Sequence, residues 1–160
     1  FADEHGNAWS DSFQIPLVVS GARIEEAGVE VIHDEDGDLQ LSPGETGRIG
    51  VWGRNSGTTD AIDVYAVTST TSSWITVSQC WSISPAGSTD WCDHESNACL
   101  CDGTGYSHDL APGATSEREI TRLELMIDAA APVAPIPFDI TFHDGLGNQW
   151  TDAFEVGVSP

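Results

Sequence analysis

One segment of this chain occurs twice, once at each end. Residues 142–158 read FHDGLGNQWTDAFEVGV, and residues 1–17 read FADEHGNAWSDSFQIPL. Seven residues recur at an offset of 141 positions, namely two Phe, two Asp, one Gly, one Asn and one Trp. In both copies large apolar residues alternate with polar or small ones, which is the period-2 pattern of a half-buried β-strand. The repeat therefore predicts the same β-structure at both ends of the chain.

Two arrangements explain a strand that is repeated in this way. The chain can be one link of a tandem array, so that residues 1–19 supply the last strand of the preceding link and residues 20–160 form the body. Alternatively, the opening strand leaves its own body and completes the sheet of a neighbouring copy. The anchors that this exchange would bury are Trp9, Phe13, Ile15 and Leu17. A third interpretation is two similar strands within one sheet.

The charge balance limits the partners of the chain. Its 160 residues are enough for one domain, and 5 basic against 26 acidic residues give a formal net charge of −21. Such a surface repels phosphate backbones and anionic lipid, so we expect no nucleic-acid binding. No stretch of about 18 apolar residues occurs, so we expect no membrane insertion. Cation binding and adaptation to high salt both agree with this balance.

Short alternating segments at regular spacing predict an all-β fold. Ile62, Val64 and Ala66 are expected to share one inward face, and residues 18–27 are expected to form a connector. Seven or eight such strands without a helical segment are typical of an immunoglobulin-like antiparallel β-sandwich. The tryptophans expected in the core or at its edge are Trp9, Trp52, Trp74 and Trp150. The strands expected after the opening one cover 29–33, 48–54, 62–67, 74–84, 120–127, 138–143 and 150–158.

Four cysteines in an acidic, Lys-free chain favour an oxidising compartment and two disulfides. Three of them lie in a Cys-rich loop predicted over 85–105, which the disulfides would staple. Pairing of Cys99 with Cys101 is geometrically awkward at one residue's separation. The remaining connectivities are Cys80–Cys101 with Cys92–Cys99, which we favour, and Cys80–Cys99 with Cys92–Cys101. The alternative chemistry is a zinc site, with the ligands Cys92, His94, Cys99 and Cys101.

Residues 34–45 have the composition of a calcium loop. Counted as twelve positions, the loop presents oxygen ligands at positions 1, 3, 5, 7, 9 and 12. Gly37 stands at position 4 instead of the usual position 6, and predicted strands flank the loop, so we expect a calcium loop on a β scaffold. The alternative is a solvated acidic turn in which Leu39 and Leu41 cap the core. The predicted calcium ligands are Asp34, Asp36, Asp38, Gln40, Ser42 and Glu45.

Other clusters are open to two interpretations. Asp144, Asn148 and Asp152 can hold a second cation or satisfy the backbone of a turn. Their counterparts in the first copy are Asp3, Asn7 and Asp11. Trp81 and Trp91, beside the Cys-rich loop, can form an exposed platform for polysaccharide. The five His are scattered and match no catalytic motif, so we expect a protein that is not an enzyme.

Four short turn motifs follow one another along the body in a characteristic order. This order resembles the bacterial immunoglobulin-like modules of the CARDB kind, and the resemblance covers most of residues 28–158, apart from the Cys-rich insertion. It implies a β-sandwich with an extracellular adhesive, spacer or structural role, and it supplies no catalytic residues. The motifs are LSPGE at 41–45, NSG at 55–57, LAPG at 110–113 and DGLGNQW at 144–150.

The function that these observations favour is that of an extracellular or cell-surface structural repeat unit or filament subunit, stabilised by calcium. Its copies would join head to tail, by strand complementation or by tandem repetition. The alternative is a carbohydrate-binding accessory module of a secreted hydrolase.

Overall fold

All regular elements that the structure describes are β-strands. The computed structural model describes residues 20–81, 91–93, 98–101 and 108–160, with side chains described over 20–78 and 109–160. No helix that could cross a membrane occurs in these ranges. The strands are β1 (Ile24–His33), β2 (Thr46–Asn55), β3 (Ala61–Ser69), β4 (Ile75–Trp81), β5 (Trp91–Asp93), β6 (Ala98–Cys101), β7 (His108–Leu110), β8 (Thr121–Ile127), β9 (Ile136–His143) and β10 (Gln149–Val156).

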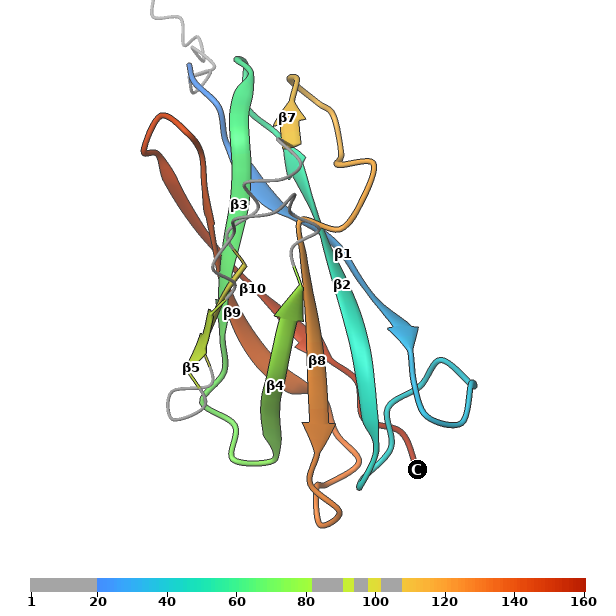
Figure 1. Cartoon of the computed structure of the whole chain (residues 1–160). Coiled ribbons are helices and arrows are strands. Elements are labelled where there is room, and N and C mark those ends of the chain that lie inside the picture. The colour runs from blue at the N-terminus through green and yellow to red at the C-terminus, as the bar shows by residue number, and fades with distance from the viewer. Residues whose placement is uncertain (1–19, 82–90, 94–97, 102–107) are drawn as a thin grey trace, which may run out of the picture.

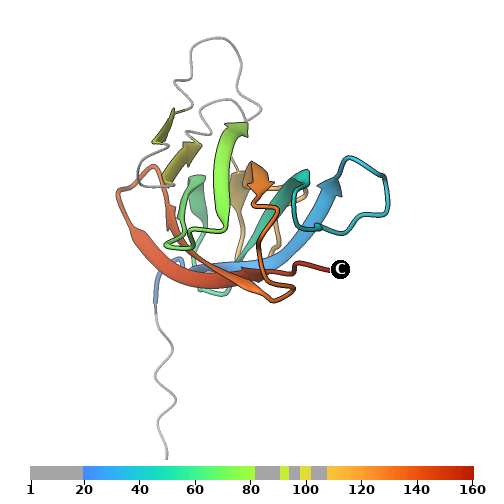
Figure 2. The ribbon, with the colours of Figure 1, turned by 90° about the horizontal axis from the view of Figure 1, so that it is seen from below.

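The strands form two antiparallel sheets that pack face to face, which confirms the predicted immunoglobulin-like β-sandwich (Figures 1 and 2). One sheet has four strands in the order β1-β2-β8-β4. The other has six strands, in the order β10-β9-β3-β6-β5 with β7 also paired to β3. The edge strands β1 and β10 come together along one side, where Glu26 N of β1 donates a hydrogen bond to Asp152 Oδ2 of β10 at 3.0 Å.

The core lies between the sheets and follows the period-2 pattern of the strands. In β8 the side chains of Leu123, Leu125 and Ile127 are buried, and those of Arg122 and Glu124 lie between them on the outer face. Each such buried side chain contributes about 1.5–3 kcal/mol of hydrophobic free energy. The largest fully buried side chains are Phe138, Phe142, Ile24, Leu41, Ile49, Ile75, Leu123, Leu125, Ile140, Val51, Val64 and Val77.

The two ends of the sandwich are referred to below as its poles. The N-terminal pole carries residues 20–23, 56–60, 111–114 and 144–148. The C-terminal pole carries residues 34–45, 70–74, 128–135 and 157–160. Residue 20 and the C-terminus therefore lie at opposite ends of the long axis (Figure 1).

A buried amide holds the N-terminal pole together. The Asn55 side chain is fully buried, and its Nδ2 donates to Thr59 O at 2.8 Å and to Leu110 O at 2.7 Å. Its Oδ1 accepts from Arg23 N at 3.2 Å and from Gly57 N at 2.9 Å. One side chain thus joins three loops by satisfying backbone groups that would otherwise be buried without partners.

Strand β1 begins earlier than the sequence pattern predicts. The expected connector over 18–27 is wrong in its second half, because the strand begins at Ile24 and that side chain is buried. The acidic pair Glu25 and Glu26 resembles loop sequence. An edge strand accepts such charges, since one of its sides faces solvent.

A β-bulge changes which side chains of β3 point inward. Asp63 has a positive φ of 54°, and the pairing of β3 with β7 shifts register between Ala61 and Val64. An extra residue in one strand reverses the alternation of faces. Ala61 and Val64 are therefore buried, whereas Ile62 is 43% exposed, so the predicted inward orientation of Ile62 is wrong.

Two further expectations are corrected. The predicted loop over 85–105 contains β5 and β6, which form an antiparallel pair that extends the larger sheet from β3. Main-chain hydrogen bonding at a sheet edge recruits such short segments without any side-chain pattern. Trp74, expected to be packed, is 40% exposed at the C-terminal pole, because it precedes β4 and stands outside the alternation. Trp150 packs against the core as expected.

The close packing of the N-terminal pole can be tested at Gly57. A Cβ there would collide with Gly21 O and lie 2.6 Å from Arg23 N. These are backbone atoms, so we expect Gly57→Ala to lower the free energy of unfolding by about 1–3 kcal/mol, as overpacking does elsewhere. Gly28→Ala is the matched control, because no atom lies within 4 Å of its added Cβ. Equal losses for both variants in chemical denaturation would contradict this account.

Candidate functional site

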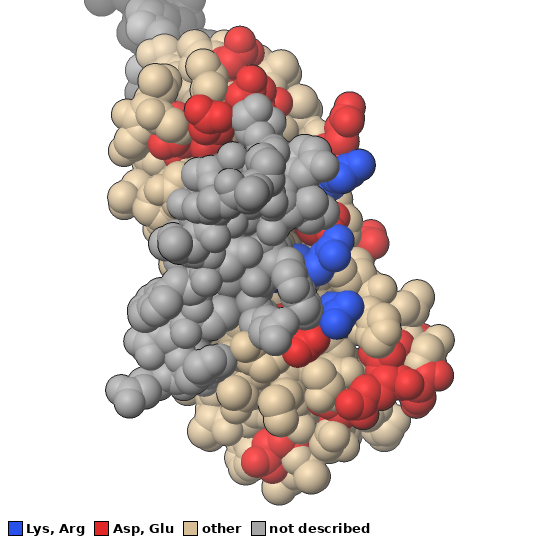
Figure 3. All heavy atoms as spheres, viewed as in Figure 1, with Lys and Arg blue, Asp and Glu red and all other residues tan. Residues whose placement is uncertain are grey.

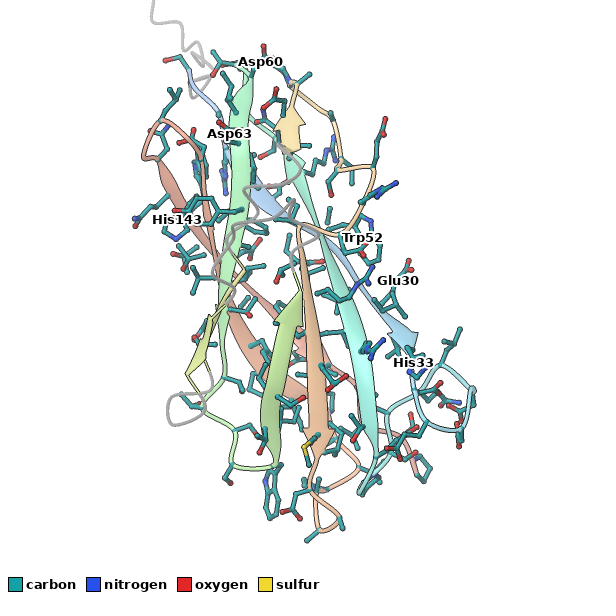
Figure 4. The ribbon with its side chains drawn as sticks, viewed as in Figure 1. Glu30, His33, Trp52, Asp60, Asp63 and His143 are labelled. Atoms are coloured by element: carbon teal, nitrogen blue, oxygen red, sulfur yellow. The ribbon has the colours of Figure 1, made fainter. Side chains whose placement is uncertain are left out.

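Three carboxylates gather at the C-terminal pole, in the loop that follows β1. One oxygen from each of Asp34, Asp36 and Asp38 can be chosen so that all three lie within 4.8 Å of one another. Asp34 is buried, and the other two side chains are exposed. His33, the last residue of β1, lies directly before this loop (Figure 4). Alternate residues converge here because the loop curls back on itself between β1 and β2.

Asp34 organises the tip of the acidic loop. Its Oδ1 accepts a hydrogen bond from Gly37 N at 3.0 Å, and its Oδ2 accepts one from Leu39 N at 2.6 Å. Gly37 and Leu39 have positive φ values of 84° and 60°. A left-handed conformation is natural for Gly but costly for Leu, so the hydrogen bonds to Asp34 compensate for strain at Leu39.

Glu45 closes the neck of the same loop. Its Oε1 accepts from Glu35 N at 3.0 Å and its Oε2 accepts from Ser42 N at 2.9 Å. The side chain is nearly buried, with 8% of its surface exposed. Both of its oxygens are thus engaged by backbone N–H groups, as in the caps that acidic side chains form elsewhere.

The pKa values of Asp34 and Asp38 are shifted in opposite directions. Desolvation would raise the pKa of Asp34, but hydrogen bonds from Leu39 N, Asp38, Gln40 N and Gly37 N together hold that pKa below its ordinary value. For Asp38, the hydrogen bond from Gln40 N lowers the pKa. Desolvation, the shared hydrogen bond with Asp34 and the charges of Asp36 and Asp34 outweigh it, so the pKa of Asp38 is raised. A bound cation would relieve this repulsion.

The loop offers part of the predicted ligand set. Asp34, Asp36 and Asp38 come together, as the count from position 1 requires. Glu45 is outside this group, and Gln40 Nε2 donates to Asp38 Oδ2 at 3.4 Å. Calcium prefers six to eight oxygen ligands, so three carboxylates would need loop carbonyls or water to complete its shell. The full set with Gln40, Ser42 and Glu45 stays a prediction.

The second copy of the repeated segment forms the end of β9, a turn and β10. Asp144 is buried and its Oδ1 accepts from Leu146 N and Asn148 N at 3.0 and 2.8 Å. Asn148 Nδ2 donates to Asp144 Oδ2 at 2.8 Å, and Gly147 has a positive φ of 85°. Asp144, Gly147 and Asn148 therefore build the turn itself.

The other repeated residues attach this hairpin to the body. Phe142 and Phe154 are buried in the core, and Phe154 stacks on Phe138 with ring centroids 5.1 Å apart. Trp150 is partly buried against the same core. Asp152 Oδ2 accepts from Glu26 N at 3.0 Å, which links the hairpin to the opposite sheet. Every residue that recurs between the two copies thus has a structural role in the second copy.

This arrangement agrees with turn chemistry at Asp144 and Asn148. Both Asp144 oxygens are engaged within the turn, and Asp152 reaches β1 instead. Within the described ranges, the one group of His, Cys, Asp and Glu side chains close enough to share a metal is the acidic loop. Asp144 and Asp152 do not form a second such group there.

Several predicted residues lie outside the described part of the chain. The first copy of the repeat is one such segment, with Asp3, Asn7, Trp9, Asp11, Phe13, Ile15 and Leu17, and His94 is another such residue. For Cys80, Cys92, Cys99 and Cys101, and for Trp81 and Trp91, the backbone alone is described. The register of β5 with β6 sets Cys92 opposite Cys99. The disulfides, the zinc alternative and the polysaccharide platform therefore stay predictions.

The sequence pattern did not identify an aromatic stack on the outer face of the larger sheet. Tyr65 of β3 and His143 of β9 are cross-strand neighbours, with ring centroids 4.8 Å apart and planes 7° from parallel. Desolvation lowers the pKa of His143 below its ordinary value. These two residues are 78 positions apart, and they become neighbours because β3 pairs with β9. No local motif in the sequence reveals that pairing.

On the visible surface the acidic side chains are spread toward both ends of the molecule, and the basic ones lie along one side of it (Figure 3). Arg48 Nε lies 3.2 Å from Glu124 Oε2, across the pairing of β2 with β8. Arg122 forms an ion pair with Glu119. These arginines therefore act within the four-stranded sheet and leave a negative field over the poles.

Comparisons with known proteins assign no family. No protein-family model and no curated protein matches the chain. A lipoprotein from Bacteroides thetaiotaomicron is 17% identical over 92% of this chain and 85% of that chain, with a TM-score of 0.33. AvmM, which catalyses macrocyclization in alchivemycin A biosynthesis, is 14% identical over 89% and 92%, with a TM-score of 0.41. PapD-like domain 7 of human CEP192 is 13% identical over 96% and 98%, with a TM-score of 0.39.

These similarities are too weak to carry an argument about function. The resemblance to CARDB-like modules stays a prediction, since none of these proteins is named as such a module.

The contact between β1 and β10 can be tested at Glu26. Desolvation and the nearby Asp152 charge raise the pKa of Glu26, against a hydrogen bond from Gly28 N that lowers it. A raised carboxyl pKa stabilises the fold below the unfolded-state pKa, and this contribution is lost as pH rises through the folded-state pKa. Glu26→Gln should therefore stabilise the protein at pH 7, by about 0.5 kcal/mol for this half-exposed group.

The corresponding rise in melting temperature is about 1–2 °C, and it should vanish below about pH 4. Glu25→Gln, at the adjacent position of β1, controls for the loss of one negative charge. A gain that is the same for both variants, or that persists in acid, would contradict the assigned contact.

Proposed function

We propose that this chain is one link of a tandemly repeated extracellular structural protein. Its immunoglobulin-like sandwiches would join head to tail through the polypeptide itself. The observation that carries this proposal is the role of the repeated residues. All seven build the last hairpin of the described body or attach it to that body. A second segment with the same seven residues is suited to the same position in another body.

The tandem arrangement is favoured over strand exchange for two reasons. First, residues 142–158 already occupy the place of the last hairpin, so a neighbouring copy would have no vacant groove for residues 1–17. Second, the repeat includes Asp11, the counterpart of Asp152, whose partner in the described body is β1 of the other sheet. The segment therefore carries features for a complete preceding sandwich.

The length of the repeat supports the same conclusion. Leu17 and Val158 are counterparts at the offset of 141 residues. All ten described strands lie between these two positions. One offset thus corresponds to one whole sandwich, as in an array of identical units.

Deletion of residues 1–19 separates the possible arrangements. In the tandem arrangement this segment belongs to another body, so we expect the truncated chain to remain monomeric. Its melting temperature should lie within about 1 °C of that of the full chain, a smaller shift than a loss of about 1 kcal/mol in stability would cause. Strand exchange predicts that the full chain forms concentration-dependent oligomers in analytical ultracentrifugation and that the deletion abolishes them. A large drop in melting temperature in a monomer would assign the segment to its own body and contradict the proposal.

The extracellular part of the proposal rests on the cysteines. Opposed residues of an antiparallel pair have Cα atoms about 4.5–5.5 Å apart, within the span of a disulfide. The register that sets Cys92 opposite Cys99 supports the connectivity Cys92–Cys99 with Cys80–Cys101. Two disulfides of this kind would staple the region between β4 and β7 in an oxidising compartment.

A cation at the acidic loop is the remaining part of the proposal. Asp34, Asp36 and Asp38 bring three negative charges within 4.8 Å at a pole of an already acidic protein. Calcium accepts carboxylate oxygens from such a loop, and its charge would offset the repulsion among these three carboxylates. We propose that calcium stiffens the loop at the end where the chain would continue into its next copy.

Calcium should reverse the effect of Asp38→Asn on the melting temperature. Without calcium, Asp38→Asn removes a repulsive charge and should leave the melting temperature equal or higher. With millimolar calcium, wild-type protein should gain melting temperature, and Asp38→Asn should lose most of that gain because a ligand is missing. Asp60→Asn, at the opposite pole, is the charge-matched control, because the Asp60 side chain is exposed. No calcium-dependent difference between these two variants in calorimetry would contradict the cation site.

A further inference from the structure

Over residues 20–78 and 109–160, the large exposed hydrophobic side chains are concentrated toward the poles. Among the described residues, each large hydrophobic side chain that is exposed lies in a loop or at most one residue from a strand end. The sides of the sandwich carry none within 20–78 and 109–160, where side chains are described. These side chains are Leu39, Trp74, Met126 and Val133 toward the C-terminal pole and Ile62 and Leu146 toward the N-terminal pole.

We propose that the C-terminal pole of each repeat packs against the N-terminal pole of the repeat that follows it. The occupant of the exposed apolar surface is thus a second copy of this chain, docked end to end. This inference rests on the tandem array proposed above and adds that its junctions are packed contacts instead of free hinges.

The C-terminal pole offers a pocket for such a contact. The pocket has a volume of about 140 Å³ and lies where the start of β4 meets the end of β8. Trp74, Met126 and Ile127 supply its apolar lining, and Ser73, Thr76 and Asp128 supply its polar lining. Asp128 N donates to Trp74 O at 2.8 Å, which fixes the tryptophan backbone beside the β8–β9 loop. Val133, in that same loop, is 56% exposed.

The N-terminal pole offers a matching apolar pair. Gly145 N donates to Ile62 O at 2.8 Å, so the β9–β10 turn lies against the bulge of β3. Leu146 is 71% exposed in that turn, and Ile62 is exposed in the bulge. Asp60 and Asp63 lie at the same end of the molecule (Figure 4). An apolar pair with a charged surround is typical of a small interface.

The length of the connection brings the two poles together. In the described body the chain remains attached up to Ser159, whose N donates to Leu41 O at 2.8 Å. At the offset of 141 positions, Ser159 corresponds to Val18, so Val18 would be the last residue attached to the preceding repeat. The body attaches again at Gly21, whose O accepts from Thr58 N at 2.8 Å and whose N donates to Thr58 Oγ1 at 3.2 Å.

Three Cα–Cα steps separate Val18 from Gly21, a span of about 11 Å at full extension. Two sandwiches joined by so short a segment must touch at their ends. The exposed side chains at those ends would then be removed from water, which is favourable in proportion to the apolar area buried.

A two-repeat chain tests this inference. It consists of residues 1–160 followed directly by residues 20–160, so that its junction reproduces the proposed register. We expect it to melt about 2–4 °C above the single chain, and to scatter X-rays as one rigid elongated particle. Trp74→Ser in the first repeat, at the junction, should remove the rise in melting temperature. The same substitution in the second repeat, at the free pole, should leave that rise in place.

Leu146→Ser gives the reciprocal test, with a loss expected in the second repeat and none in the first. Equal effects of either substitution in both repeats would overturn the inference, as would scattering from two freely jointed bodies. So would binding of a soluble polysaccharide to the single chain that Trp74→Ser abolishes. If deletion of residues 1–19 gives the expected result but the two-repeat chain does not, the tandem array still stands and only the packed junction is contradicted.

Discussion

The structure depends on two sheets that each have one apolar face and can bury it only against the other. Side chains such as Phe138, Phe142 and Leu125 alternate with polar ones along their strands and meet in a single layer. A sandwich of this kind keeps its polar residues on the outer faces, which lets the chain carry a net charge of −21 without placing charge in the core. The acidic residues that are buried accept hydrogen bonds from backbone N–H groups.

Carboxylates thus serve as structural acceptors in this protein. Asp34 and Glu45 hold the loop between β1 and β2, and Asp144 holds the turn between β9 and β10. Asp152 joins the edges of the two sheets. Each replaces a main-chain partner where the strands end or diverge, and each adds to the negative field at the poles. A cation at the acidic loop would moderate that field where the acidic pole of a neighbouring repeat approaches it.

The proposed role follows from how the last hairpin is attached. It is integral to the body, because its aromatic residues fill the core and its turn closes on Asp144. A free-standing copy of such a hairpin would expose two Phe and one Trp, so it needs a sandwich of its own. In the tandem array that we propose, a preceding sandwich would receive that hairpin. The short connection to Gly21 would then account for the exposed apolar side chains at the ends of the described body.

The strand pattern and the acidic loop could be predicted from the sequence, because each depends on neighbours within about a dozen residues. The repeat could be found by direct comparison of the two ends of the chain. Alternation in 120–127 and 138–143 predicts β8 and β9, and the Gly-Asn pair predicts the turn before β10. Other features could not be predicted, since they depend on which strands become neighbours. The bulge at Asp63 exposes Ile62, and Trp74 lies outside the alternation.

The sequence by itself determined that this chain is an all-β sandwich and that the residue pattern of its last hairpin occurs a second time in the opening segment, since period-2 burial and turn chemistry are local properties. Tertiary structure alone decided that Asp152 bonds to Glu26 across 126 positions and that Tyr65 stacks on His143. It also decided that, among the described side chains, the large apolar ones left in water lie toward the two poles. Those outcomes follow from strand order and sheet packing, which bring distant residues together and which no short segment encodes.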